Sequence, residues 1–193
     1  MIKKMFEGAE KFSYHYPKLA VIVTAHAEGK DNAMAVAWHS SISFKPPLYG
    51  ISITSKRFTY ELILKSQLFA INFMPLEASE LVASVGGSSG KNSNKLERFN
   101  IVKETSSKTS APVLTDAYAC YECKLVDHKN YGDHEWVVGE VVATHLADGV
   151  FNSQGVIELA QINPSMYVGA DYYTTASKDG VRHLDRKTYG NRC

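Results

Sequence analysis

Cysteines and long apolar runs are both scarce in this sequence. Only three cysteines occur among its 193 residues, Cys120, Cys123 and Cys193, and so few cannot form the disulfide framework of a small secreted domain. No apolar stretch approaches the ~18 residues of a membrane span, and charged side chains follow Met1 where a signal peptide would have its apolar core. We therefore expect a cytoplasmic protein without a membrane partner.

A surplus of charge of either sign is also missing. The chain has 21 Lys and Arg residues against 20 Asp and Glu residues, which gives a formal net charge of +1. Proteins that bind nucleic acids or anionic membrane surfaces usually carry a basic excess. We therefore expect no nucleic-acid partner, and any site for an anion must depend on a local group of cations.

Several nucleotide-binding and hydrolase motifs are absent as well. The sequence contains neither the G-x-G-x-x-G loop of a dinucleotide-binding fold nor a Walker phosphate loop, and the glycine-rich run at residues 86–91 has the spacing of neither. The G-x-S-x-G elbow of α/β-hydrolases is missing too. These absences argue against a dedicated dinucleotide domain and leave a hydrolase weakly supported.

The patterns that are present predict a mainly β protein. Three short helices are expected: one capped by Thr59, one that follows Pro75, and one over residues 94–99. Because the strands arrive mostly as hairpins, we predict an antiparallel β-barrel with short helical insertions. Runs of β-branched and apolar side chains between turn residues predict its strands at residues 19–24, 33–38, 48–54, 68–72, 119–127 and 135–144.

The length of the chain fits one domain. A chain of 193 residues can bury a core without support from disulfides or metals. From residue 157 onward the periodic signal is weak, and residues 171–193 are polar. We predict a single domain over residues 1–193, in which residues 171–193 form a C-terminal arm or tail.

A Cys-x-x-Cys pair, Cys120 and Cys123, allows two interpretations. This spacing occurs in zinc sites and in redox-active dithiols. Here it lies in a strand-like run without a Gly or Pro that could shape a metal knuckle, and residues i and i+3 of a strand point to opposite faces. We favour two buried structural cysteines and predict no metal site.

Two segments that lie far apart in the sequence carry cations among small polar residues. Residues 54–59 include Arg57 and lie between a predicted strand end and a helix start, where free N–H groups favour an anion. Residues 88–95 add Lys91, Lys95 and flexible backbone donors. Taken singly, each segment is more simply interpreted as a solvated loop, whereas together they could bind one phosphate.

A series of short motifs, each weak by itself, gains specificity from its order. The series runs through Asn32-Ala33-Met34-Ala35-Val36-Ala37-Trp38, Ser41-Ile42-Ser43, Lys45-Pro46-Pro47, Ser52-Ile53, Arg57-Phe58-Thr59-Tyr60-Glu61-Leu62-Ile63, Phe69-Ala70-Ile71-Asn72, Ser89-Gly90-Lys91 to Lys95, Cys120 to Cys123, Gly132-Asp133-His134 and Val138-Gly139-Glu140-Val141. Over roughly residues 15–165 this order resembles the flavin reductase-like family, to which flavoredoxin-type proteins and archaeal ferric reductases belong.

The resemblance implies an FMN-binding split β-barrel of Greek-key-like topology that works as a homodimer, with the cofactor near the dimer interface. It places three groups of side chains along the isoalloxazine ring, beside the ribityl chain or the ring, and around the phosphate. These groups are, in order, Trp38, His39, Ser40 and Ser41; Ser52 and Thr54; and Arg57, Thr59, Ser89 and Lys95. It also allows His134, at a hairpin tip, to approach the flavin, including from the second subunit.

Two positions depart from the family pattern. Asn94 stands where the family often has Asp, and Lys91 stands where it often has Arg. Both residues keep chemistry that is compatible with a phosphate. The departures therefore leave the implied phosphate site in place but change the hydrogen bonds within the loop.

The resemblance also implies a reaction. An FMN-dependent oxidoreductase would take a hydride from NADH or NADPH and pass electrons to a flavin, ferric or protein acceptor, and the flavin would carry the chemistry in place of a catalytic side chain. An alternative stays open, which is a flavoredoxin-like electron-transfer protein that binds FMN without its own NAD(P)H turnover. The sequence chooses neither the acceptor nor between NADH and NADPH.

Overall fold

A computed structural model describes residues 1–9, 11–184 and 186 of the chain, so Cys193 lies outside the described residues. Seven strands form one sheet in the order β3-β2-β6-β9-β10-β5-β4, and every pairing within it is antiparallel. These strands are β2 (Val21–Ala27), β3 (Lys30–Val36), β4 (His39–Phe44), β5 (Pro47–Ile53), β6 (Leu68–Phe73), β9 (Ala119–Tyr131) and β10 (His134–Leu146).

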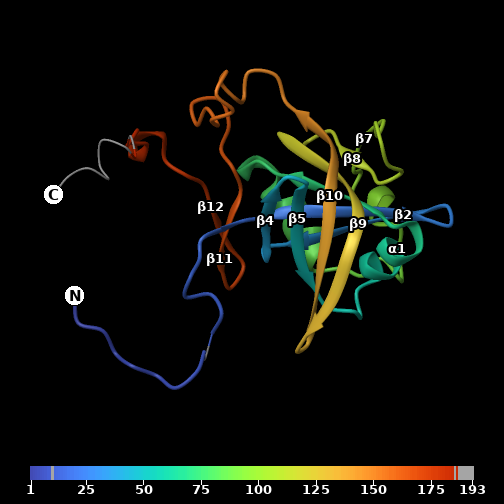
Figure 1. The fold of residues 1–193 in the computed structure, drawn as a ribbon, viewed down its shortest axis with the longest axis horizontal. Helices are drawn as coiled ribbons and strands as arrows, with labels where there is room; N and C mark the ends of the chain where they lie inside the picture. Colours follow the sequence, from blue (N-terminus) through green and yellow to red (C-terminus); the bar gives the residue numbers. More distant parts are fainter. Residues whose placement is uncertain (10, 185, 187–193) are drawn as a thin grey trace.

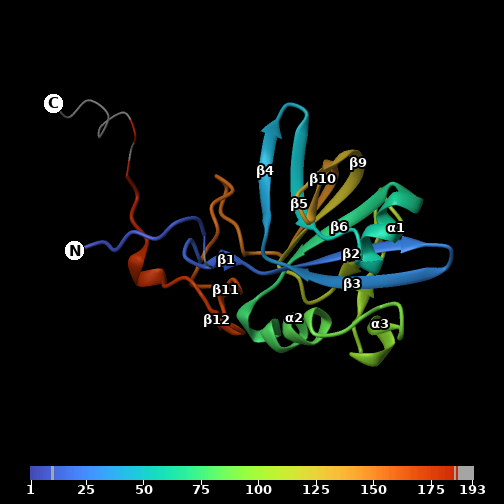
Figure 2. The same ribbon diagram turned by 90° about the horizontal axis from the view of Figure 1, so that it is seen from below.

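The sheet curls into an open barrel whose two edge strands, β3 and β4, are consecutive in the chain. The Ser52 N–H donates to the Trp38 carbonyl oxygen at 2.8 Å, which extends the pairing of β4 with β5 by one residue. The long β9–β10 hairpin crosses the middle of the molecule (Figure 1), and the β4–β5 hairpin projects from its body (Figure 2). The predicted antiparallel β-barrel is confirmed, in a split form that leaves one seam open.

Short helices and two small sheets complete the fold. The helices lie between the strands, as expected, and Figure 2 shows α2 and α3 together on one side of β2 and β3. The helical elements are α1 (Phe58–Ser66), η1 (Leu76–Ala78), α2 (Ser79–Gly86), α3 (Lys95–Arg98) and η2 (Lys178–Gly180). The small sheets pair β7 (Lys103–Glu104) with β8 (Val113–Leu114), and β11 (Met166–Gly169) with β1 (Lys18–Leu19) and β12 (Tyr172–Thr174).

The apolar core lies on both faces of β2. Val21 and Val23 point into the barrel, where Ile71 and Val137 belong to the same buried cluster. Ile22 points to the other face and packs in a second cluster beneath α2. This alternation follows from the two-residue period of a strand, and it explains why residues 19–23 are apolar without interruption.

The helix start at Thr59 is the clearest error of the sequence-based prediction. Helix α1 begins at Phe58, and its N-cap residue is Arg57, whose side chain makes no capping hydrogen bond. Thr59 is buried inside the first turn, and its hydroxyl oxygen accepts a hydrogen bond from the Asn32 Nδ2 at 2.8 Å. The prediction was wrong because this distant amide, invisible in a local pattern, takes the oxygen that would have capped the helix.

The two central cysteines point to opposite faces of β9, as predicted. Cys123 lies in the barrel core, and Cys120 packs with Ala70, Ala111 and Val113 outside it. Burial raises the pKa of the Cys120 thiol to about 12, with a further contribution from the Glu122 carboxylate. Among the described residues, no three or more His, Cys, Asp or Glu side chains gather as metal ligands would, and no helix is long and apolar enough to cross a membrane.

Candidate functional site

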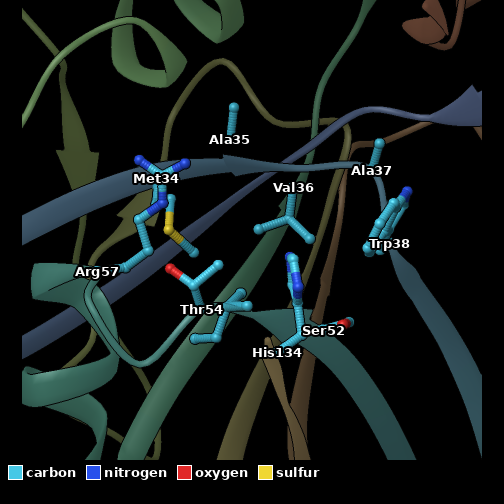
Figure 3. A pocket seen from close by; sticks show the side chains of 10 residues that line it. Met34, Ala35, Val36, Ala37, Trp38, Ser52, Thr54, Arg57 and His134 are labelled. Atoms are coloured by element: carbon cyan, nitrogen blue, oxygen red, sulfur yellow. The ribbon is translucent and has the colours of Figure 1, made fainter. Parts of the chain in front are cut away.

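A cleft of about 200 Å³ opens at the seam between β3 and β5. Strand β3 and its extension form one wall, and the end of β5 forms the other (Figure 3). Arg57 lies at one end of the cleft, and Trp38 and His134 lie toward the other. The lining residues are Met34, Ala35, Val36, Ala37, Trp38, Ser52, Ile53, Thr54, Arg57 and His134.

The Trp38 end of the cleft is built from aromatic side chains of one chain. The Trp38 Nε1–H donates to the Tyr16 hydroxyl at 2.7 Å, which fixes the indole. The His134 ring lies with its centroid 4.9 Å from that of Trp38, and its Nδ1 is 2.7 Å from the Asp133 carboxylate. His134 therefore reaches the cleft from the tip of its own β9–β10 hairpin, without a second subunit.

The opposite end of the cleft is cationic. The Lys95 ammonium group is buried, and it donates to the carbonyl oxygens of Ala33 at 2.9 Å and Val85 at 2.7 Å. Burial, together with a smaller contribution from the nearby positive charge of Arg57, lowers the pKa of Lys95 to about 8. Because Ala33 precedes Met34 of the cleft wall, Lys95 lies beside the cleft that Arg57 lines, and the two cationic segments, distant in sequence, converge in the fold.

No protein carboxylate neutralises these cations within the described part of the chain, because none of its salt bridges includes Arg57 or Lys95. Buried charges are normally paired. The carbonyl oxygens of Ala33 and Val85 compensate the burial of the Lys95 charge. Val85 lies in the last turn of helix α2, where the helix dipole favours a cation. An anion bound next to Arg57 would supply the missing negative charge.

The loop over residues 88–95 is brought to this end of the cleft by a close backbone contact. A Cβ atom at Gly90 would lie 2.0 Å from the Oδ1 of Asn32, so only glycine fits there. Asn32 is buried, and its Oδ1 has no hydrogen-bond partner although its Nδ2 donates to Thr59. The contact places α1, β3 and the loop around one polar corner.

The structure brings together only part of the residue set that the family resemblance implies. Trp38, Ser52, Thr54 and Arg57 line the cleft, together with His134. Thr59 and Lys95 are buried at its cationic end without lining it, and Ser89 lies exposed in the neighbouring loop. Their predicted contacts with a phosphate remain predictions.

The other three implied residues lie on β4, away from the cleft. The His39 Nε2–H donates to the Leu19 carbonyl oxygen at 2.8 Å, and its Nδ1 accepts from the Tyr49 hydroxyl at 2.7 Å. Burial lowers the pKa of His39, which favours this neutral ring. Ser40 and Ser41 are exposed, and the Ser40 hydroxyl donates to the Ser41 carbonyl oxygen at 3.1 Å.

The sequence did not predict that β3 and the residue after it would line the cleft. Met34, Ala35, Val36 and Ala37 line the cleft beside Trp38, yet they were assigned no role. The available signal was the run of short side chains that leads directly to Trp38. Small residues at the edge of a sheet leave its backbone accessible, which is one feature of a strand that contacts a ligand.

Two further cavities adjoin the cleft. One, of about 450 Å³, shares Ala35, Val36 and Ala37 with it and continues between α2 and the β11–β12 hairpin. The other, of about 510 Å³, shares Trp38, Ser52 and His134. Such volumes are in the range of small-molecule sites, and the cleft together with the first of these cavities suits a planar ring system that carries a phosphate at the Arg57 end.

Comparison with known proteins identifies the family to which this chain is related. The sequence profile described as "Flavin reductase like domain" matches residues 13–176. An uncharacterized protein of Aeropyrum pernix is 31% identical over 157 residues, which are 80% of this chain and 58% of the relative, so the chain spans only part of that protein's length. The reductase component of an FADH(2)-dependent resorcinol hydroxylase of Rhizobium is 27% identical over 135 residues, 69% of this chain and 73% of the relative.

Among solved structures, the fold is similar to that of an FMN-binding protein of Thermus thermophilus with bound 1-cyclohex-2-enone. The TM-score is 0.84 at 29% sequence identity, and the match covers 95% of this chain and 100% of the other. The similarity therefore extends over nearly the whole chain.

Proposed function

Because this chain belongs to the flavin reductase-like domain family, we propose that it is an FMN-dependent oxidoreductase. In this proposal it takes a hydride from NADH or NADPH and passes electrons to a flavin, ferric or protein acceptor. The Thermus relative supports FMN as the cofactor, and the Rhizobium relative supports a reductase activity. Cys120 and Cys123 are free thiols, as we expect for a protein that functions in the reducing cytoplasm.

The observation that carries the proposal is the difference between the two ends of the cleft, one cationic and the other aromatic. Its Arg57 end suits the phosphate of FMN, and its Trp38 end suits the ring system. Thr54 and Ser52 lie between them, where hydroxyl groups can bind the ribityl chain. When bound, FMN supplies the redox chemistry, and the side chains of this cleft hold and orient it.

The open seam determines how a nicotinamide can reach the cofactor. The chain carries no dinucleotide-binding loop, so the donor has to bind at the mouth of the cleft, over an exposed face of the ring. We expect NADH or NADPH to bleach the bound flavin under anaerobic conditions within minutes, and absorbance near the flavin visible band measures this directly. Reduction by dithionite or a protein donor alone would instead establish the electron-transfer alternative, and a protein that refuses FMN would exclude both.

We further propose that the working form is a homodimer and that the projecting β4–β5 hairpin contributes to its interface (Figure 2). Ile42 and Phe44 on this hairpin are exposed, Phe44 at 95%. Beside the hairpin lies an apolar cavity of about 350 Å³ that includes Tyr49, Tyr121 and Phe151. An exposed apolar surface of this kind is typical of a protein–protein contact.

Phe44→Asp should convert the dimer to a monomer at micromolar concentration, because a carboxylate cannot be desolvated in an apolar interface without a partner. Sedimentation velocity measures the change. Val102→Asp is the matched control, since Val102 is also exposed, at 63%, but lies outside the hairpin. A wild-type monomer, or a Phe44→Asp variant that still dimerises, would contradict this interface.

A further inference from the structure

The cavity of about 510 Å³ beside the Trp38 end of the cleft is lined mainly by rings. We call it the aromatic cavity. Its lining residues are Phe12, Trp38, Ser52, Tyr131, Asp133, His134 and Trp136. They come from the N-terminal segment, the start of β4, the end of β5 and the tip of the β9–β10 hairpin, so three parts of the chain distant in sequence bring aromatic side chains to one place.

The rings of the aromatic cavity are held in position by the surrounding structure. The Phe12 ring lies 5.7 Å from the Trp38 ring, centroid to centroid, at an interplanar angle of 59°. Trp136 lies directly on the backbone of β5, because a Cβ atom at Gly50 would be 2.3 Å from its Cζ2 atom. The rings are nevertheless only partly covered: Trp136 is half-buried and Phe12 is 62% exposed. Faces of positioned rings therefore remain available to a ligand.

The charges around the aromatic cavity differ from those of the neighbouring cleft. Within the described part of the chain no lysine or arginine lines it, and the one carboxylate there, on Asp133, already accepts a hydrogen bond from His134. An anionic ligand would face the Asp133 charge, and the nearby ammonium group of Lys129 already lies over the Tyr131 ring, 5.4 Å from its centroid. The Ser52 hydroxyl, which both cavities share, is a polar group that can orient an uncharged ligand.

We propose that the aromatic cavity binds the planar aromatic part of an uncharged substrate beside the flavin. Stacking between aromatic rings favours flat partners beyond what burial of area alone provides, by about two- to tenfold in affinity for each pair. The inference rests on the proposed function only in taking FMN as the occupant of the neighbouring cleft. Phe12, Tyr131 and Trp136 are then the residues that select the substrate class.

The test compares two uncharged ketones that differ in ring planarity, acetophenone and cyclohexyl methyl ketone, by calorimetric titration of the FMN-loaded protein. We expect acetophenone to bind at least about fivefold more tightly. Phe12→Leu and Trp136→Leu should each remove most of this preference. Phe6→Leu is the control, because Phe6 is an exposed ring of the same N-terminal segment outside the cavity. A third ligand, 4-acetylbenzoate, should bind at least tenfold more weakly than acetophenone.

The FMN affinity of each variant, measured by flavin fluorescence, separates this inference from the proposed function. Phe12→Leu should leave the FMN affinity unchanged, since Phe12 does not line the cleft. If FMN binds but the two ketones bind equally well, or if Phe12→Leu and Trp136→Leu keep the preference, the aromatic cavity does not select planar substrates. If the protein refuses FMN, the proposed function itself fails.

Discussion

Glu122→Gln should lower the free energy of unfolding by about 3–5 kcal/mol, the range found when one partner of a buried charged network is removed. Glu122 lies in β9 between the two cysteines, and its side chain is completely buried, at 0% exposure. A folded domain is stable by only about 5–15 kcal/mol in total. This single substitution should therefore remove a large share of the stability.

The expected cost follows from the donors that converge on the Glu122 carboxylate. One oxygen accepts from the Ser107 N–H at 2.7 Å and from the His145 Nε2 at 2.6 Å. The other accepts from the N–H groups of Lys108 at 2.9 Å and Thr109 at 2.6 Å, and from the Thr109 hydroxyl at 2.8 Å. Glutamine has nearly the same shape, but its NH₂ group would face donors where an acceptor is needed, and buried donors without an acceptor are costly.

The same network predicts a pH dependence. Burial by itself would raise the pKa of Glu122, but the hydrogen bonds from His145, Ser107, Lys108 and Thr109 outweigh it and lower the pKa from 4.5 to about 2. The unfolded chain therefore takes up a proton at a higher pH than the folded protein does. The stability that the carboxylate contributes is fully present above about pH 4.5 and is lost as the pH falls toward 2.

Urea denaturation of wild type and Glu122→Gln at pH 7, 5, 4 and 3 measures both effects. The difference between the two proteins should be largest at pH 7 and should shrink below about pH 4.5, because the unfolded wild-type chain then takes up a proton that the folded protein does not bind until the pH nears 2. Glu104→Gln is the matched control: Glu104 is exposed, and the change should stay within about 0.5 kcal/mol. A small difference at pH 7 would show that the network does not stabilise the fold, and a large difference that stays constant from pH 7 to pH 3 would show that its contribution does not depend on the carboxylate charge.

Glu122 also illustrates what the sequence can and cannot predict. The strand that contains it was predicted from its neighbours, and so was the opposite orientation of Cys120 and Cys123, because a strand has a two-residue period. The role of Glu122 could not be predicted, since all of its donors come from residues 107–109 and from β10. Local patterns determine which way a side chain faces but not what it meets across the fold.

Strand β4 and the β11–β12 hairpin were missed for a related reason. Ser40, Ser41 and Phe44 are all exposed, so β4 lacks the apolar alternation that marks a half-buried strand. Strand β12 starts in the polar segment that was predicted to be an arm. Its Tyr173 ring packs on the Tyr167 ring of β11, with 5.3 Å between the ring centroids. These elements are specified by partners rather than by their own composition. The ordered motifs fared better, because a family pattern includes such distant constraints.

The structure also distinguishes two cations that the sequence treats alike. Arg57 and Lys95 were both assigned to the phosphate, and the fold does bring them to one end of the cleft, Arg57 in its lining and Lys95 behind Ala33. Arg57 is exposed at the cleft wall, whereas the Lys95 ammonium group is buried between two carbonyl oxygens. We expect Arg57 to bind the phosphate directly and Lys95 mainly to hold β3 against α2.

Arg57→Gln should therefore weaken FMN binding by roughly ten- to a hundredfold, because a charge-assisted hydrogen bond contributes about 1.5–3 kcal/mol and about 1.4 kcal/mol is tenfold in affinity. Riboflavin, which lacks the phosphate, should bind weakly to wild type and be nearly indifferent to the change. Titration of the apoprotein with FMN and with riboflavin, followed by flavin fluorescence, gives both constants.

Two comparison variants make the role of Arg57 specific. Lys56→Gln removes the same charge from the adjacent exposed residue of the same turn, which does not line the cleft, and should change FMN affinity by less than about threefold. Lys95→Gln should instead lower the stability of the protein and weaken FMN and riboflavin together, because the carbonyls of Ala33 and Val85 lose their buried donor. If Arg57→Gln also weakened both ligands equally, Arg57 would support the fold rather than the phosphate, and the orientation proposed for FMN in the cleft would be wrong.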